Sequence, residues 1–414
     1  MSRLLHTSDW HLGHTLYGHS REEDFAAVLA EIVAIAQESR PDLIIHSGDL
    51  FHSSRPAIHD QFRAMRTLRQ LAAIAPTVVV AGNHDSPVHF DFFDYMTGSS
   101  CGRGLFFIGQ RRPARDGGVL TFDACDGEQR IRLGVLPFVH PNRFWQHSST
   151  SGTSYADYAD AMRGLQGELL EAMHERYAAD RDILVFTAHV FVAGATTSPS
   201  ERAVGDDFET PPTDLPEVSY AALGHIHRPQ VIESLKFTAR YAGSPLPMDF
   251  GEANETKSVV IVDADPGRPV RALPRRLSSG RRLAEFNGTL DELKAEAAQY
   301  VGTFLKPTIT GEEPGGLLSQ KIAEIVPHAT IINPTPARAA ADGTVLESDL
   351  GDEPELPDAF RAYLASEGLS GEAAESTVTA FLHLLHELDD ETQAPTPAEE
   401  LLRAALEDTW TEAS

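Results

Sequence analysis

The sequence of 414 residues contains only two cysteines, Cys101 and Cys125. Two cysteines cannot form a disulfide framework, and they are typical of a protein in a reducing cytoplasm. Nowhere do about 18 apolar residues follow one another, which argues against a membrane-spanning helix. The N-terminus also has no apolar run of signal-peptide length. We therefore expect a cytoplasmic protein with no membrane association.

Two further shortages narrow the class of function. The phosphate-binding loop Gly-x-x-x-x-Gly-Lys-Ser/Thr does not occur, so the chain is not expected to bind ATP by that route. Basic residues are outnumbered, with 34 Lys and Arg against 61 Asp and Glu and a formal net charge of −27. The deficit is uneven, because residues 347–414 hold 18 acidic and 2 basic residues, a net of −16. This acidic end is a poor surface for nucleic acid and is better suited to solvent or a protein partner.

What is present is typical of a folded protein. Hydrophobic residues make up 42% of the chain, and 414 residues are enough for two or three domains. Apolar runs predict strands at 4–8, 43–47 and 77–81, and helical stripes predict intervening helices at 20–40 and 60–75. The second helix should share one apolar face between Phe62, Met65, Leu68, Leu71 and Ala72. This alternation predicts a parallel sheet with right-handed crossovers.

The rest of the chain is predicted to contain further strands and several loops. We expect strands at 105–108, 130–136, 182–187 and 220–223, hairpin-like strands over 231–263, a long helix at 155–177 and loops at 148–154 and 198–216. A change of composition near Pro266 indicates a boundary, and the stretch 268–282 carries six arginines and no acidic residue. That stretch fits either a DNA contact or a solvated linker. A strand–helix–strand–helix–strand pattern follows over 283–332, then a Pro/Ala/Asp-rich segment, then two helices at 358–369 and 371–388.

Polar side chains follow five of the predicted strands. The residues are Asp9 with His11, Asp49, Asn83 with His84, His189, and His225 with His227. In parallel sheets functional groups gather beyond the carboxyl ends of the strands. Without His84, the set offers seven oxygen or nitrogen ligands, which is more than one metal needs. Two metals about 3.5–4 Å apart, bridged by one carboxylate, use all seven, and Asp49 is the natural bridge because a carboxylate has two oxygens.

The ligand types indicate the chemistry. Mixed imidazole and carboxylate ligation suits Mn²⁺, Fe²⁺ or Zn²⁺, and the absence of thiolates argues against a cysteine-type zinc site. Such a metal pair binds a phosphate ester, lowers the pKa of a bound water and stabilises an in-line transition state. The leaving alkoxide then needs a proton. His84 follows the predicted ligand Asn83, and an imidazole titrates near neutrality, so His84 is suited to be the general acid.

These motifs, in this order, resemble the calcineurin-like metallophosphoesterases. Their flanks at 6–13, 221–227 and 241–245 resemble the SbcD nucleases of the bacterial SbcCD complex, over roughly the first 265 residues. The resemblance implies an α/β fold: a sandwich of two mixed sheets flanked by helices, with a small α/β capping domain and a C-terminal helical tail. The domains would be a nuclease domain at 1–265, a capping domain at 280–335, a linker at 336–356, a helix-loop-helix at 357–390 and an acidic tail at 391–414.

The resemblance also implies roles for particular residues. One metal would be held by Asp9, His11, Asp49 and His227, and the other by Asp49, Asn83, His189 and His225. His84 would be the catalytic histidine, and the two metals would be manganese. His52 matches a second active-site histidine of archaeal relatives, although many bacterial members have an acidic residue there. The capping domain would help to position DNA, and the C-terminal helices would dock on an SbcC-like, SMC-type ATPase, with a homodimer forming part of a heterotetramer.

Two other functions fit part of the pattern. A metallophosphoesterase acting on a small nucleotide phosphodiester would use the same ligands, but it would not need the additional module and tail. A catalytically silent scaffold that recruits the partner would not need an intact His84 or a complete ligand set. The apolar stripe of the last helix, at Val378, Phe381, Leu382, Leu385 and Leu388, fits either a partner's groove or the chain's own core. A metal-dependent DNA nuclease subunit is the function that the whole pattern favours.

Overall fold

The chain divides into two compact units, Met1–Leu283 and Ala284–Ser414. The computed structural model describes residues 1–97, 104–125, 127–140, 155–198, 209–233, 235–311, 317–339, 345–346 and 377–378. The first unit extends 18 residues beyond the boundary that the composition suggests at 265. The reason is that β12 (Arg271–Arg276) pairs antiparallel along β11 (Ser258–Ala264). The arginine-rich stretch is therefore largely an edge strand of the first unit and not a linker.

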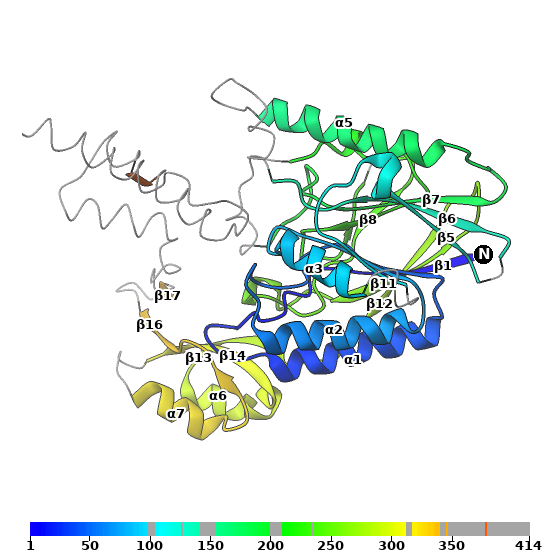
Figure 1. Cartoon of the computed structure of the whole chain (residues 1–414). Coiled ribbons are helices and arrows are strands. Elements are labelled where there is room, and N and C mark those ends of the chain that lie inside the picture. Colours follow the sequence, from blue (N-terminus) through cyan, green and yellow to red (C-terminus); the bar gives the residue numbers. More distant parts are fainter. Residues whose placement is uncertain are drawn as a thin grey trace, which may run out of the picture. The chain divides into compact units, whose positions relative to one another are not determined.

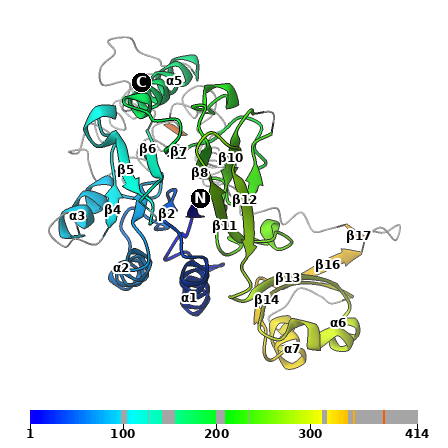
Figure 2. The same ribbon diagram turned by 90° about the vertical axis from the view of Figure 1, so that its right-hand side faces the viewer.

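The first unit contains two six-stranded sheets, which Figures 1 and 2 show from two sides. The first sheet has the order β12, β11, β1 (Ser2–Thr7), β2 (Leu43–His46), β3 (Thr77–Val80) and β4 (Leu105–Ile108). The second has the order β5 (Val119–Asp123), β6 (Arg130–Leu136), β7 (Asp182–His189), β8 (Tyr220–Gly224), β10 (Thr238–Tyr241) and β9 (Gln230–Val231). Strands β1 to β4 are mutually parallel, as are β6, β7, β8 and β10. The remaining pairs, β1 with β11, β11 with β12, β5 with β6 and β9 with β10, are antiparallel.

Alternating side chains of each strand pack on opposite faces of its sheet. In β1, Leu4 lies in the cluster between the two sheets, whereas Leu5 lies in the cluster that covers the outer face of the first sheet. In β7, Val185 faces the first sheet and Phe186 the outer face of the second. A fully buried aliphatic or aromatic side chain contributes about 1.5–3 kcal/mol. The predicted α/β sandwich of two mixed sheets is confirmed.

Helices cover both outer faces of this sandwich. Helices α1 (Glu22–Ser39), α2 (Ile58–Ala72) and α3 (Pro87–Thr97) pack on the first sheet, and α5 (Tyr155–His174) packs on the second. Figure 1 accordingly shows α5 on one side of the two sheets and α1 with α2 on the other. Short helical turns lie at Ala114–Gly118, Pro212–Asp214 and Phe250–Glu252. The sequence pattern had not indicated α3, which is rich in aromatic residues that favour helices only weakly.

The second unit has the predicted strand–helix alternation. Its elements are β13 (Arg282–Gly288), α6 (Leu290–Glu296) with the turn Ala297–Tyr300, β14 (Thr303–Thr310), α7 (Leu317–Ile325), β15 (Thr330–Ile331), β16 (Thr335–Ala339) and β17 (Val345–Leu346). Thr289 begins α6 with a capping box that includes Glu292. The predicted linker at 336–356 begins instead with β16, which pairs with β14.

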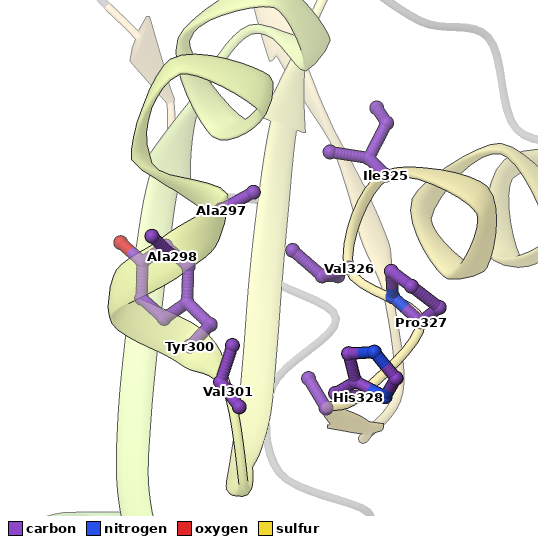
Figure 3. A pocket seen from close by; sticks show the side chains of 9 residues that line it. Ala297, Ala298, Tyr300, Val301, Ile325, Val326, Pro327 and His328 are labelled. Atoms are coloured by element: carbon purple, nitrogen blue, oxygen red, sulfur yellow. The ribbon is translucent and has the colours of Figure 1, made fainter.

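An open hollow of about 180 Å³ lies in the second unit (Figure 3). Its walls are mostly apolar and include Tyr300, Val301 and Val326, with the imidazole of His328 at one side. None of its nine lining residues carries a carboxylate, so it lacks the acidic ligands predicted for the metals.

Part of the prediction lies outside the described residues. This holds for the loop at 148–154, most of the loop at 198–216, the acidic tail at 391–414 and the two C-terminal helices apart from 377–378. Across the part of the chain that the structure describes, no helix has the length and apolar character needed to cross a membrane.

Candidate metal centre

The loops that leave β1 and β2 run side by side and carry the first predicted ligands. The backbone N–H of Asp9 donates to the carbonyl of Gly48 at 2.9 Å, and that of His11 donates to the carbonyl of Asp49 at 3.1 Å. Asp9, His11 and Asp49 adopt left-handed backbone angles, with φ of 51°, 46° and 53°. Non-glycine residues rarely do so, and such strain gathers at functional sites because the surrounding structure has to maintain it.

Two glycines allow the loops to approach one another. A Cβ at Gly82 would lie 2.0 Å from Oδ1 of Asp49, and a Cβ at Gly48 would lie 2.1 Å from Nδ1 of His189. Both distances are far below van der Waals contact, so any larger residue would displace a predicted ligand. The glycines in the Gly-Asp and Gly-Asn-His-Asp motifs are thus needed for close packing of the site itself.

A first group of ligand atoms comes from Asp9, His11 and His227, and these atoms lie within 4.8 Å of one another. Nε2 of His11 lies 3.0 Å from Nε2 of His227 and 3.4 Å from Oδ2 of Asp49. Asp9 also accepts a hydrogen bond from the backbone N–H of His225 at 3.0 Å. All three side chains of the group are buried.

A second group surrounds Asn83. Its Oδ1 lies 3.0 Å from Nε2 of His189 and 3.0 Å from Nδ1 of His225. Nε2 of His189 is also 3.4 Å from Oδ2 of Asp49. Asp49 therefore borders both groups through one oxygen, and the structure brings all seven predicted ligands into one cluster.

The hydrogen bonds of this cluster direct ligand atoms inward. Nδ1 of His189 donates to the carbonyl of Ser47 at 3.0 Å, so Nε2 is the ring nitrogen that faces the oxygens of Asn83 and Asp49. Oδ2 of Asp9 is buried and has no hydrogen-bond partner among the described residues. A buried oxygen without a donor, beside inward-facing imidazole nitrogens, fits a cation.

The pKa values follow from the same charges. Burial acts to raise the pKa of Asp49, but the surrounding imidazoles, above all His189 and His84, hold it well below its ordinary value. Burial would lower the pKa of His189, yet the carboxylates of Asp49 and Asp9 raise it to about 9. Burial, with a contribution from Asp49, raises the pKa of Asp9 to about 7. Burial lowers the pKa of His225 to about 3, so that ring stays neutral and available as a ligand.

The two predicted catalytic histidines lie beside this cluster. The backbone N–H of His84 donates to Oδ1 of Asp49 at 3.0 Å, and its ring centroid lies 4.9 Å from that of His11. Nδ1 of His84 lies 3.0 Å from the carbonyl of His52 and donates to it. The rings of His52 and His84 are stacked, with centroids 5.7 Å apart and an interplanar angle of 14°. His84 is half-buried, as are the ligands Asn83 and His225, and His52 is exposed, whereas the other five predicted ligands are buried.

Several residues that support the site were not predicted from the sequence. Asp85 is buried and accepts backbone hydrogen bonds from Leu50 and Gly82, at 3.0 and 2.9 Å, so it joins the loops after β2 and β3. It belongs to the Gly-Asn-His-Asp motif, but the motif does not reveal this role. Glu252 and Lys257, which lie behind His227, have no local sequence signal at all.

Comparisons with known proteins agree with this geometry. The family model for calcineurin-like phosphoesterases matches residues 2–229. The SbcD subunit of the nuclease SbcCD of Bacillus subtilis is 33% identical over 292 residues, which cover 69% of this chain and 72% of that protein. The chain belongs to the calcineurin-like phosphoesterases of the SbcD type. The SbcD proteins of Escherichia coli K12 and Rhodobacter capsulatus are 28% and 29% identical, covering 74% and 71% of this chain and 76% and 74% of theirs.

In a calcineurin-like phosphoesterase, this cluster of carboxylates and imidazoles supports two divalent metal ions. The donor set fits them, because the ligand atoms are hard oxygens and imidazole nitrogens and no thiolate contributes among the described residues.

Metal binding is expected to release protons. At pH 8 the ring of His189, with a pKa of about 9, is largely protonated without metal, so a cation at Nε2 has to displace about one proton. At pH 6 Asp9, with a pKa of about 7, is protonated as well, so release rises towards about two protons and metal affinity falls. Calorimetric titration with MnCl₂ in two buffers of different ionisation enthalpy measures the number of protons. A binding heat that does not depend on the buffer at pH 8 would contradict this expectation.

Proposed function

We propose that this protein is the metal-dependent nuclease subunit of an SbcCD-type complex, hydrolysing DNA phosphodiesters in DNA repair and recombination. It would act on double-stranded ends as an exonuclease and on single strands and hairpins as an endonuclease, as the family resemblance implies. The observation that carries the proposal is the convergence of the seven predicted ligands around Asp49, with His84 in contact with the same carboxylate. The 33% identity to an SbcD protein of the nuclease SbcCD supports the choice of substrate.

The two groups of side chains support one metal position each. Asp9, His11, Asp49 and His227 would hold the first ion, and Asp49, Asn83, His189 and His225 the second. When bound, the two ions supply Lewis acidity and nucleophile activation for hydrolysis of a phosphodiester. Manganese is our proposed metal, because mixed oxygen and imidazole ligation suits it and the resemblance implies it.

His84 is our proposed general acid. Its Nδ1–H is engaged by the carbonyl of His52, so Nε2 is the atom that can carry a proton to the leaving oxygen of the DNA strand. Its partial exposure leaves room for a substrate phosphate beside the cluster. His52, stacked on this ring, is proposed as a second active-site residue that contributes through its position beside His84.

The direct test uses purified full-length protein with Mn²⁺. Degradation of linear duplex DNA, and cleavage of a hairpin, would support the nuclease. Hydrolysis of only a small chromogenic phosphodiester would favour the small-substrate phosphoesterase instead. If protein that binds Mn²⁺ cleaves neither substrate, the result would favour the catalytically silent scaffold that recruits the partner.

The parts of the chain outside the metal centre support further proposals. We propose that the second unit contains the capping domain, which would help to position DNA. We also propose a cytoplasmic location, which the low cysteine content supports.

We propose that the protein forms a homodimer through α2 and α3. Both helices pack on the same face of the first sheet, yet they expose large apolar side chains: Ile58, Phe62, Phe92, Tyr95 and Met96. Phe62 was predicted to share the buried face of α2, but it is 77% exposed, and Tyr95 is 83% exposed. Contiguous exposed apolar side chains mark protein interfaces. We propose that these side chains form such a surface and that a second copy of the chain covers it.

Phe62→Glu is expected to convert the dimer to a monomer, because it places a charge in a desolvated apolar contact. Light scattering coupled to size-exclusion chromatography measures the mass. Gln70→Glu adds a charge elsewhere on α2 and should leave the mass unchanged. A monomeric wild-type protein, or a dimeric Phe62→Glu variant, would show that this face is not the interface.

The C-terminal region is our proposed docking segment for an SbcC-like ATPase. Truncation after residue 352 should abolish co-purification with that partner but leave Mn²⁺-dependent cleavage of flexible single-stranded DNA, because all predicted ligands lie before residue 230. Phe381→Glu should weaken the association in the same way, and the acidic charge of the segment should make it weaken as salt rises. Undiminished pairing by the truncated chain would place the docking surface elsewhere.

A further inference from the structure

His227 is held from behind by a buried carboxylate. Glu252 has no solvent exposure, and its Oε1 lies 3.0 Å from Nδ1 of His227. Glu252 ends the short turn Phe250–Glu252, where its backbone N–H donates to Oδ1 of Asp249 at 3.1 Å. Its other oxygen, Oε2, accepts from the backbone N–H of Met248 at 3.0 Å. The carboxylate is thus fixed by backbone contacts on one side and faces His227 on the other.

This contact determines which nitrogen of His227 is available for a cation. An ionised carboxylate only accepts hydrogen bonds, so Nδ1 of His227 has to carry the hydrogen. The neutral ring then has its lone pair on Nε2, the atom that lies 3.0 Å from Nε2 of His11. The ring is consequently held in the tautomer and orientation that a ligand in the first group needs.

Lys257 keeps this carboxylate paired in the interior. Its side chain is 4% exposed, and Nζ lies 2.6 Å from Oε2 of Glu252. The same ammonium donates to the backbone carbonyl of His227 at 3.0 Å and to Oε2 of Glu255 at 2.9 Å. A buried carboxylate is costly unless it is paired and fully hydrogen-bonded, and Lys257 satisfies that requirement while also tying down the backbone of His227.

His189 in the second group has no equivalent support among the described residues. Nδ1 of His189 donates to a neutral backbone carbonyl, that of Ser47. Nδ1 of His11, in the first group, is buried and has no hydrogen-bond partner among the described residues. Of these three imidazoles, only His227 contacts a carboxylate through the ring nitrogen that faces away from the cluster.

We infer that Glu252, held by Lys257, is a positioning residue that fixes His227 to bind a divalent cation together with Asp9 and His11. A carboxylate behind a ligating imidazole both orients the ring and makes it a better donor, and loss of such a partner lowers metal affinity by about 10–100-fold. The inference rests on the proposed two-metal centre. It predicts that the two metal positions respond differently to one substitution outside the ligand set.

The experiment is a titration of the metal-depleted full-length protein with MnCl₂, in which binding is measured by calorimetry and by electron paramagnetic resonance. Wild-type protein should bind two Mn²⁺ and give the spectrum of a coupled pair. Glu252→Gln should bind one Mn²⁺ with wild-type affinity and the other about 10–100-fold more weakly. At intermediate Mn²⁺ the variant should therefore give the six-line spectrum of an isolated ion. A merely structural role would weaken both ions together and would not produce that intermediate.

Glu255→Gln is the matched control. It removes the same charge from Lys257, at a contact of 2.9 Å, but it does not touch His227, so both affinities should stay at the wild-type value. If Glu252→Gln fails to fold because Lys257 loses its fully buried partner, the double variant Glu252→Gln/Lys257→Met removes both buried charges and carries the same expectation.

Each other outcome overturns the inference. Two unchanged affinities in Glu252→Gln would mean that His227 needs no such support. Equal weakening of both ions would mean that Glu252 acts on the cluster as a whole. Wild-type protein that does not bind two Mn²⁺ would refute the proposed metal centre, and with it this inference. Because this result is measured on the wild-type protein alone, it can be distinguished from a failure of the inference about Glu252.

Discussion

Replacing Asp49 with alanine is expected to empty both metal positions and to lower DNA cleavage by at least about 10³-fold. Oδ2 of Asp49 lies 3.4 Å from Nε2 of His11 in the first group and 3.4 Å from Nε2 of His189 in the second. The substitution therefore removes a carboxylate oxygen that lies at the same distance from an imidazole of each group. Metal ions contribute several kcal/mol of transition-state stabilisation, and about 1.4 kcal/mol corresponds to a factor of ten. Native mass spectrometry with Mn²⁺ counts the ions, and cleavage of linear duplex DNA gives the rate.

His11→Ala is the comparison that makes this test specific. His11 contacts Asp49 and His227 but none of the residues around Asn83, so its loss should empty mainly one position. Equal metal loss in the two variants, or two ions retained by Asp49→Ala, would mean that Asp49 is not the bridge.

Replacing His84 with alanine is expected to separate chemistry from metal binding. Cleavage should fall by about 10²–10⁴-fold, the usual contribution of a positioned general acid. Both metals should remain, because the contact between His84 and Asp49 is made by the backbone N–H, which alanine retains. The fold should also remain, since the half-buried side chain makes one hydrogen bond, to the carbonyl of His52. The measurements are the manganese nuclease rate, the metal count and the melting temperature.

Two further variants serve as comparisons for His84→Ala. His59→Ala removes an exposed imidazole of α2 outside the cluster and should leave the rate unchanged. His52→Ala removes the ring stacked on His84 and should have a smaller effect than His84→Ala. Near-full activity in His84→Ala would exclude it as the general acid, whereas loss of metal from that variant would make it a ligand.

The sequence alone determined the elements and the chemical types of the site. The apolar run at 4–8 predicted a buried strand, and in a strand the consecutive residues Leu4 and Leu5 lie on opposite faces, as the structure shows. The alternation of strands and helices predicted parallel strands whose carboxyl ends share one edge. For that reason the sequence alone predicts that the polar residues after these strands form one cluster. These features depend on local periodicity and on side-chain chemistry, which the sequence displays directly.

Only the tertiary structure decided what depends on contacts between distant segments. The arginine-rich stretch became an edge strand because β11 was available to pair with it, which moved the domain boundary to 283. Phe62 has the spacing of a buried residue, but the sheet covers a different side of α2, so it is exposed. Glu252 reaches His227 across 25 residues with no periodic pattern between them. Long-range packing determines which neighbour covers a face and which charge pairs with a buried nitrogen. A local sequence pattern carries no information about such contacts.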